Sequence, residues 1–266
     1  MIGIFDSGVG GLSVLKVLME KAPYIDAVYF GDIKNAPYGI KTQDELKKLT
    51  IEGVKILLEN GAKNILSACN SISAFMILDD LKELSDKPFR IMEMINPTVE
   101  EFKKYDNLAI FATPATIEAG VYQKGFEKHG LKIKTFAIPE LAGAIDFGKS
   151  EEEVEKIVEQ AVSMATGVAI ETALLCCTHY PFVKDKFENA FENSPRQGLG
   201  EKVQIFDPAE VVAKETIKKF NLQAQVSDTC GFKKGKIRFL ISKDSSVFRK
   251  MVEENFWGFE YTVEVL

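Results

Sequence analysis

Two cysteine-bearing segments carry the residue types in this chain that are best suited to proton transfer. The first reads ACNS and contains Cys69, and the second reads CCTHYP and contains Cys177 and His179. A helix N-terminus stabilises a thiolate at the end of the preceding strand, and a nearby histidine can relay its proton. If two such thiols face each other, one removes a proton from a carbon and the other protonates the opposite face. That chemistry inverts a stereocentre and needs no cofactor.

Each thiol needs an acid/base partner, because a free thiol is mostly protonated at neutral pH. Asp6 is the candidate partner of Cys69, and His179 is the candidate partner of Cys177. Either cysteine could instead be a small buried hydrophobe, which is the commoner role of a single thiol. A disulfide and a metal site are both disfavoured, since the chain has no C-x-x-C pair and only 2 histidines.

A glycine-rich turn follows the first apolar run of the chain. The segment Asp6-Ser7-Gly-Val-Gly-Gly exposes backbone N–H groups near a helix N-terminus, which favours a carboxylate or phosphate ligand. It matches neither the dinucleotide fingerprint G-x-G-x-x-G nor the phosphate loop G-x-x-x-x-G-K-[ST]. The alternative is that the glycines only form the turn and that Asp6 caps the helix.

Short apolar runs alternate with longer amphipathic segments along the chain. The expected strands are 2–5, 27–30, 65–68, 89–94, 108–112, 133–137, 172–176, 203–206 and 237–241. The expected helices are 12–21, 43–60, 72–84, 97–105, 117–129, 151–166, 184–193 and 208–220. Capping boxes mark the helix starts after Thr42 and Ser150. This alternation predicts an α/β fold with mainly parallel sheets and helices on both faces.

Five of the expected strands end in polar loops. The loops are 6–11, 31–39, 69–71, 113–116 and 177–181. In open α/β sheets, ligands bind just beyond the carboxyl ends of the strands. We therefore expect these loops to form one site.

A weak internal repeat relates the two cysteine segments. The strings IGIFDS and LAIFAT contain the strand-end residues Phe5 and Phe111. Cys69 follows Phe5 by 64 positions, and Cys177 follows Phe111 by 66 positions. The spacing predicts two related α/β halves in which Cys69 aligns with Cys177 and Ala68 aligns with Cys176. Cys176 is then a packing residue at a strand end. The alternative is a chance likeness between short apolar strings.

The composition excludes several other classes of protein. The 266 residues suffice for two small domains, and the formal net charge of −6 disfavours a nucleic-acid binder. No signal peptide is recognisable, and the longest uncharged stretch, 64–78, is too polar and too short to span a membrane. Four cysteines without a secretion signal favour free thiols in a reducing compartment, so we expect a cytoplasmic protein.

Taken together, the motifs resemble those of glutamate racemases, cofactor-independent enzymes of the aspartate/glutamate racemase superfamily. The matching segments are IGIFDSGVGGLSVL, YFGD followed by APYG, ACNS, ATPATI and CTHYP. They occur in order along nearly the whole chain, and the tail RFLISKDSSVFRKMVEENFWG is similar to the closing strand and helix of that family. Each motif alone is weak, whereas the set is highly specific.

The resemblance implies two pseudo-symmetric, doubly wound domains that face each other across a cleft. Residues 1–94 with 207–266 would form the first domain, and residues 95–206 the second. Cys69 and Cys177 would be the catalytic thiols, assisted by Asp6 and His179. The implied substrate-binding positions are Asp6, Ser7, Pro37, Tyr38, Gly39, Asn70, Ser71, Thr113, Thr116, Thr178 and His179. The implied activity is racemisation of L-glutamate to D-glutamate for peptidoglycan, without a cofactor, by a homodimer.

The chain departs from the pattern of the family at four places. Ser71 replaces a threonine and lacks its methyl group, which favours looser binding, and Ile33 stands where threonine is common. Cys176 replaces a glycine before the second catalytic cysteine. Asp146 stands where the family has glutamate, and its shorter side chain reaches less far toward His179 or Cys177.

Two other functions compete with glutamate racemisation. One is a related racemase that acts on aspartate or another amino acid. The other is a regulatory protein without turnover, because some racemase-like proteins are thought to restrain DNA gyrase. The acidic charge argues against direct DNA contact but not against a protein partner.

Overall fold

The computed structural model describes residues 1–78, 88–194, 202–222 and 234–266. Within these ranges the strands form two parallel sheets. Sheet A has the order β10 (Glu260–Val265), β9 (Lys236–Ile241), β2 (Ala27–Gly31), β1 (Ile2–Asp6), β3 (Asn64–Ser67) and β4 (Arg90–Met92). Sheet B has the order β6 (Lys134–Ala137), β5 (Leu108–Ala112), β7 (Thr172–Cys176) and β8 (Gln204–Phe206). The predicted α/β class with parallel sheets is confirmed.

The two sheets repeat one strand order, which accounts for the internal repeat of the sequence. The order β2-β1-β3-β4 in sheet A corresponds to β6-β5-β7-β8 in sheet B. Cys69 lies just beyond β3, and Cys177 lies just beyond β7, which is the equivalent strand. The repeat therefore places the two thiols at equivalent carboxyl ends.

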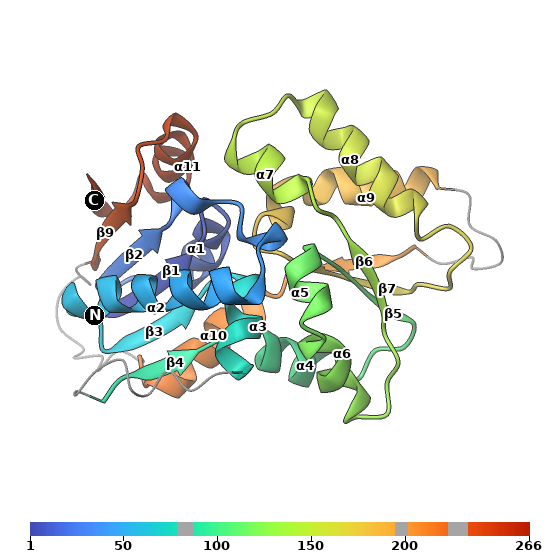
Figure 1. The fold of residues 1–266 in the computed structure, drawn as a ribbon, viewed down its shortest axis with the longest axis horizontal. Coiled ribbons are helices and arrows are strands. Elements are labelled where there is room, and N and C mark those ends of the chain that lie inside the picture. Colours follow the sequence, from blue (N-terminus) through green and yellow to red (C-terminus); the bar gives the residue numbers. More distant parts are fainter. Residues whose placement is uncertain (79–87, 195–201, 223–233) are drawn as a thin grey trace.

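Helices cover both faces of each sheet, and Figure 1 shows the two lobes side by side. Those packed with sheet A include α1 (Gly11–Lys21), α2 (Gln43–Glu59), α3 (Asn70–Leu78), α10 (Ala209–Phe220) and α11 (Ser246–Phe256). Those packed with sheet B include α4 (Ile95–Phe102), α5 (Pro114–Glu118), α6 (Val121–Glu127), α7 (Leu141–Asp146), α8 (Glu151–Ser163) and α9 (Lys184–Asn193). The chain thus returns to the first lobe after β8. The exact domain boundaries, 1–94 with 207–266 and 95–206, stay a prediction.

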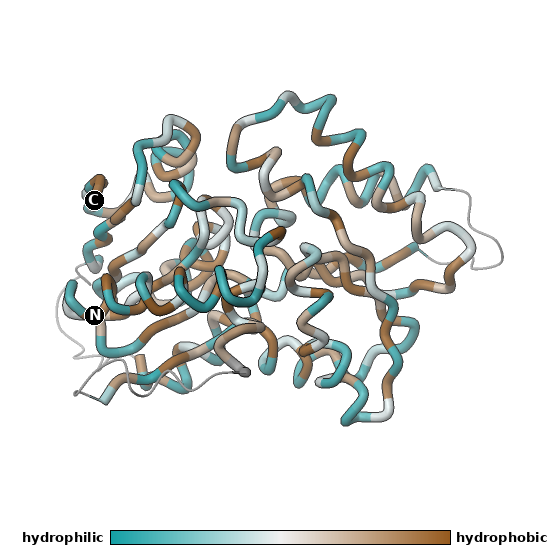
Figure 2. The backbone as a smooth tube through the Cα atoms, viewed as in Figure 1, coloured by the Kyte–Doolittle hydropathy of each residue, from teal (hydrophilic) through white to brown (hydrophobic). Residues whose placement is uncertain are grey.

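Apolar side chains fill four layers, one on each face of each sheet, and Figure 2 shows the apolar strands inside the polar outer helices. Alternation along β7 decides where the neighbouring cysteines lie, because successive strand residues point to opposite faces. Cys176 is buried in the layer under α4 and α6, and Cys177 in the layer under α7 and α8. Among the described residues, no helix is both long and apolar enough to cross a membrane.

Both capping boxes are present. Thr42 accepts a hydrogen bond from Glu45 N, whose side chain bonds back to Thr42 N, and Ser150 pairs with Glu153 in the same way. Satisfying backbone N–H groups at a helix start stabilises that end, which explains why these two starts were predictable from the sequence.

Several expected elements differ from the structure. The single helix expected at 117–129 is wrong, because Gly120 adopts a left-handed φ of 66° and separates α5 from α6. Helix α7 and strand β10 were not expected, and α4 begins two residues before its expected start. The strand expected at 89–94 is shorter, and the end of the helix expected at 72–84 lies outside the described residues.

Candidate active site

One small buried cavity collects nearly all the predicted site residues. Its lining consists of Ser7, Pro37, Tyr38, Gly39, Cys69, Asn70, Ser71, Thr113, Thr116, Ala142, Cys177, Thr178 and His179. Both thiols therefore face the same space from different sheets. Asp6 and Asp146 lie behind this lining, while Ala142 was not predicted because a small apolar residue carries no chemical signal. The catalytic and binding roles of these residues stay predictions.

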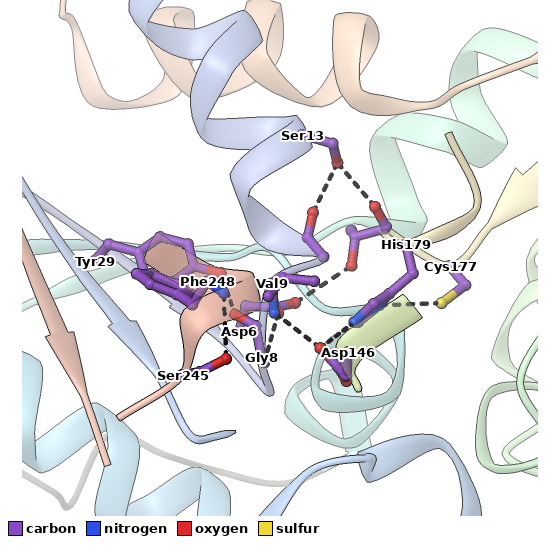
Figure 3. Close-up of polar contacts among 12 residues, drawn as sticks. Asp6, Gly8, Val9, Ser13, Tyr29, Asp146, Cys177, His179, Ser245 and Phe248 are labelled. Carbon is purple, nitrogen blue, oxygen red and sulfur yellow. Dashed lines mark hydrogen bonds and ion pairs between the residues drawn. The ribbon is translucent and has the colours of Figure 1, made fainter. Parts of the chain in front are cut away.

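Cys177 belongs to a chain of three buried side chains (Figure 3). Its Sγ lies 3.7 Å from His179 Nδ1, and His179 Nε2 lies 2.9 Å from Asp146 Oδ1. The shorter Asp146 side chain thus still reaches His179. The arrangement places an imidazole between a thiol and a carboxylate, which is the geometry of a proton relay.

The carboxylate controls the protonation of the histidine. Burial alone would lower the pKa of His179, but the charge and hydrogen bond of Asp146 outweigh it and raise that pKa above its ordinary value. A protonated His179 donates from both ring nitrogens, to Asp146 on one side and toward the Cys177 sulfur on the other.

Cys69 has different surroundings at the N-terminus of α3. Backbone N–H groups of Ser71 and Ile72 donate to its sulfur, whereas His179 pairs with the sulfur of Cys177. Burial, followed by the negative charge of Asp6, raises the pKa of the Cys69 thiol. Burial likewise raises the pKa of Asp6, against the effect of His179. A carboxylate with a raised pKa is a stronger base, which suits it to accept a proton from a neighbouring group.

The glycine-rich turn joins the two lobes through hydrogen bonds. Val9 N donates to Asp146 Oδ1 at 3.1 Å (Figure 3). Ser13 Oγ donates to the carbonyl oxygen of Thr178 at 3.0 Å. Thr178 Oγ1 also donates to Asp6 Oδ2 at 3.3 Å. The turn of the first lobe therefore contacts the carboxylate that holds His179 in the second lobe.

Close approach explains two of the glycines in this turn. A Cβ atom at Gly8 would lie within 3.0 Å of Asp146 Oδ1, and one at Gly10 would lie within 3.0 Å of His179 Nδ1. Gly10 has an ordinary φ of −57°, so its backbone conformation alone does not require glycine. The need for glycine comes from the facing lobe.

Three hydroxyl groups from both lobes meet on the far side of the cavity. Ser71 Oγ lies 3.1 Å from Thr113 Oγ1 and 3.3 Å from Thr116 Oγ1, and the two threonine hydroxyls lie 3.1 Å apart. Rotatable hydroxyls of this kind can turn toward an anionic ligand. Tyr38 is fixed next to them by its bond to Asp32 Oδ2 at 2.6 Å.

The cavity is nearly closed. The centre of a water-sized sphere can occupy only about 10 Å³ of it, which is room for about one water molecule. A larger cavity of about 530 Å³ lies between α4 and α10, but it contains none of the predicted site residues. The chemistry-bearing groups are thus enclosed between the lobes.

Known proteins resemble the chain in sequence and in structure. The family model for Asp/Glu/Hydantoin racemase matches residues 13–216. A glutamate racemase of Lactobacillus helveticus is 32% identical over 253 residues, which cover 94% of this chain and 91% of that protein.

Two solved glutamate racemases share the fold. The enzyme isoform of Bacillus anthracis superposes with a TM-score of 0.83 at 27% identity, covering 100% of this chain and 97% of the other. The enzyme of Francisella tularensis, solved in complex with D-glutamate, gives a TM-score of 0.83 at 26% identity, covering 100% and 96%. With its paired thiol loops and its matching sequence, the chain belongs to the Asp/Glu/hydantoin racemase family, and the relatives it matches over most of its length are glutamate racemases.

Proposed function

We propose that the protein interconverts L-glutamate and D-glutamate by proton transfer between Cys69 and Cys177. The observation that carries the proposal is the single buried cavity that both thiols line from opposite lobes. The sequence relatives named glutamate racemase support the choice of substrate, as does the related structure that holds D-glutamate.

In the proposed reaction, one thiolate removes the α-proton of the bound amino acid. The C–H bond breaks, its electron pair stays on the α-carbon, and the sulfur becomes a thiol. The opposite thiol then gives its proton to the other face of that carbon and becomes a thiolate. The substrate is inverted and nothing is oxidised or reduced, so these residues need no cofactor for the reaction.

Different partners restore the protonation state of the two thiols after each turnover. On one side, His179 can deliver a proton to Cys177 or take one back, while Asp146 keeps the imidazole in place. On the other side, Asp6 acts as the base for Cys69, consistent with its raised pKa. Each thiol thus has its own route for protons.

Binding of the carboxylates is assigned to the polar groups around the thiols. The hydroxyls of Ser71, Thr113 and Thr116 line the cavity together with Ser7 of the glycine-rich turn, whereas the N–H groups of Gly8 and Val9 already donate to Asp6 and Asp146. Donors fixed in a buried site stabilise the negative charge that develops on the α-carbon and its carboxylate. Because glutamate is far larger than one water molecule, the lobes must separate to admit it.

The test is direct. Reduced protein is incubated with L-glutamate in deuterated water without pyridoxal phosphate, and the enantiomers are separated by chiral chromatography. We expect D-glutamate with deuterium at the α-carbon. No exchange and no inversion with both thiols reduced would sink the proposal and leave a binding role without turnover. Parallel assays with L-aspartate decide the alternative substrate, since the family model covers aspartate racemases as well.

We also propose that the D-glutamate supplies peptidoglycan synthesis in the cytoplasm and that the protein is a homodimer. Growth of a bacterium that requires D-glutamate, once it expresses this chain, tests the first point. The three described cysteines are free thiols, which fits a reducing compartment. Light scattering in solution gives the mass of the assembly, and a monomer at assay concentration would contradict the dimer.

A further inference from the structure

A tyrosine outside the cavity contacts one of the predicted substrate-binding residues across the two lobes. Tyr122 on α6 donates its hydroxyl hydrogen to Asn70 Oδ1 at 2.7 Å, and both side chains are buried. Asn70 begins α3 and lines the cavity, whereas Tyr122 does not. The bond therefore links the second lobe to a residue of the first lobe at the site.

The NH₂ group of the Asn70 amide has no partner among the described residues. Asn70 Nδ2 is buried and makes no hydrogen bond to any residue that the structure describes. Buried N–H groups are nearly always paired, because an unpaired donor loses its hydrogen bonds to water without replacement. Since Asn70 lines the cavity, an acceptor for this NH₂ group fits there as part of a ligand.

We propose that Tyr122 is a positioning residue that holds the Asn70 amide with its NH₂ group toward the cavity, where it donates to a carboxylate oxygen of the bound amino acid. The inference rests on the proposed function, and it adds a residue that no sequence motif pointed to.

The environment of Tyr122 favours this orientation. Burial raises the pKa of Tyr122 well above its ordinary value, so its hydroxyl remains a donor. Besides Asn70, Thr98 and the thiol of Cys176 lie within hydrogen-bonding reach of that hydroxyl, and the charge of Glu93 also acts on it. Sulfur is a weak acceptor and Thr98 already donates to the carbonyl of Met94, so the amide oxygen is the best acceptor for the phenol.

Cys176 therefore has a definite neighbour in this chain. Its thiol lies in the same apolar layer as Tyr122 and within hydrogen-bonding reach of the phenol. The contact is secondary, because the phenol keeps its bond to Asn70 without it.

The principal experiment compares Tyr122→Phe with the wild type in steady-state racemisation. Losing the orienting bond should raise KM for glutamate roughly tenfold while kcat changes less, because the thiols are untouched. Tyr24→Phe is the matched control, since it also removes a hydrogen bond from a tyrosine to an oxygen, that of Leu222, far from the cavity. The control should leave KM within about twofold of the wild type.

A double-mutant cycle separates positioning from general stability. If Tyr122 acts through Asn70, the double variant Tyr122→Phe, Asn70→Ala should have a KM no higher than that of Asn70→Ala alone. Effects that multiply would overturn the inference, as would a Tyr122→Phe variant with wild-type KM. Thermal unfolding of each variant shows whether a lost fold accounts for the change.

Asn70→Asp tests which end of the amide faces the ligand. An aspartate still accepts from Tyr122 but turns a negative charge toward the substrate carboxylate, so KM should exceed that of Asn70→Ala. Wild-type binding by Asn70→Asp would mean that the cavity side accepts from an ammonium group, against the inference.

Titration calorimetry with D-glutamate gives the same comparisons without turnover. A wild type that binds but does not racemise would sink the proposed function alone. A wild type that racemises, with binding of Tyr122→Phe unchanged, would sink the inference alone. If the wild type does not bind glutamate, the inference fails as well.

Discussion

The Cys69 and Cys177 halves of the site share a scaffold but differ in their proton-handling groups. Both thiols lie just beyond equivalent strands, β3 and β7, in sheets of the same strand order. Cys177 has a histidine held by Asp146, whereas Cys69 has the N-terminus of α3 and the carboxylate of Asp6. The repeated fold supplies the positions of the thiols, and the loops supply unlike partners.

This difference teaches that the two halves are equivalent in geometry but not in chemistry. The half with Asp146 also depends on the other lobe, because Val9 N donates to the oxygen that binds His179. The first lobe therefore adds a hydrogen bond to the carboxylate that holds His179. Mutations in the two halves should consequently have distinguishable effects.

The largest expected effect comes from removing either thiol. Cys69→Ser and Cys177→Ser should each lower racemisation by about 10³-fold or more, because a serine hydroxyl is a far weaker acid and base partner. Each variant should still exchange the α-hydrogen of one glutamate enantiomer, and the two variants should act on opposite enantiomers. Proton NMR in deuterated water measures that exchange. Racemisation at the wild-type rate by Cys177→Ser would contradict the two-thiol mechanism.

The next largest effect should come from the lobe contact at Gly10. In Gly10→Ala the new methyl group meets His179 and Thr178, so the lobes close poorly and kcat/KM should fall roughly 10²-fold. Gly143→Ala is the control, because its Cβ would meet Pro37 of the opposite lobe at an ordinary 3.6 Å. We expect activity close to wild type for the control. Equal loss in both variants would show that the space at Gly10 is not what matters.

A moderate, pH-dependent effect is expected for the His179–Asp146 pair. Since the folded pKa of His179 is raised above 6.5, the pair stabilises the fold fully below that pH and loses its contribution as pH rises through the folded value. The gap in melting temperature between wild type and Asp146→Asn should therefore be widest near pH 6 and narrow in alkaline solution. Calorimetric scans across pH measure the gap. A gap that is constant or widens with pH would contradict the assigned charge of His179.

The smallest effect is expected at Cys176. Cys176→Ala removes a thiol that contacts Tyr122 but faces away from the cavity, so kcat/KM should stay within about threefold of the wild type. Assays of both enantiomers measure it. Loss of turnover in a folded variant would reverse the choice between the adjacent cysteines.

The two thiols and the strand-end loops could be predicted because a short stretch of sequence is enough to recognise an apolar strand and the polar residues that follow it. The sequence missed α7, since a six-residue helix gives too little periodicity to recognise, and α7 carries Asp146 and Ala142. It also missed the break at Gly120 and the contact between Tyr122 and Asn70, which depends on how two lobes meet. Contacts between distant segments leave no local pattern in a single sequence.

The most direct test of the central claim follows the α-hydrogen through a single turnover. The wild type is mixed in excess with L-glutamate that carries deuterium at the α-carbon, in ordinary water, and the first D-glutamate formed is analysed by mass spectrometry. Two opposed thiols predict a product that has lost its deuterium, because the removed and delivered protons belong to different sulfurs. A product that retains the deuterium would show that one group serves both faces, which would contradict the account.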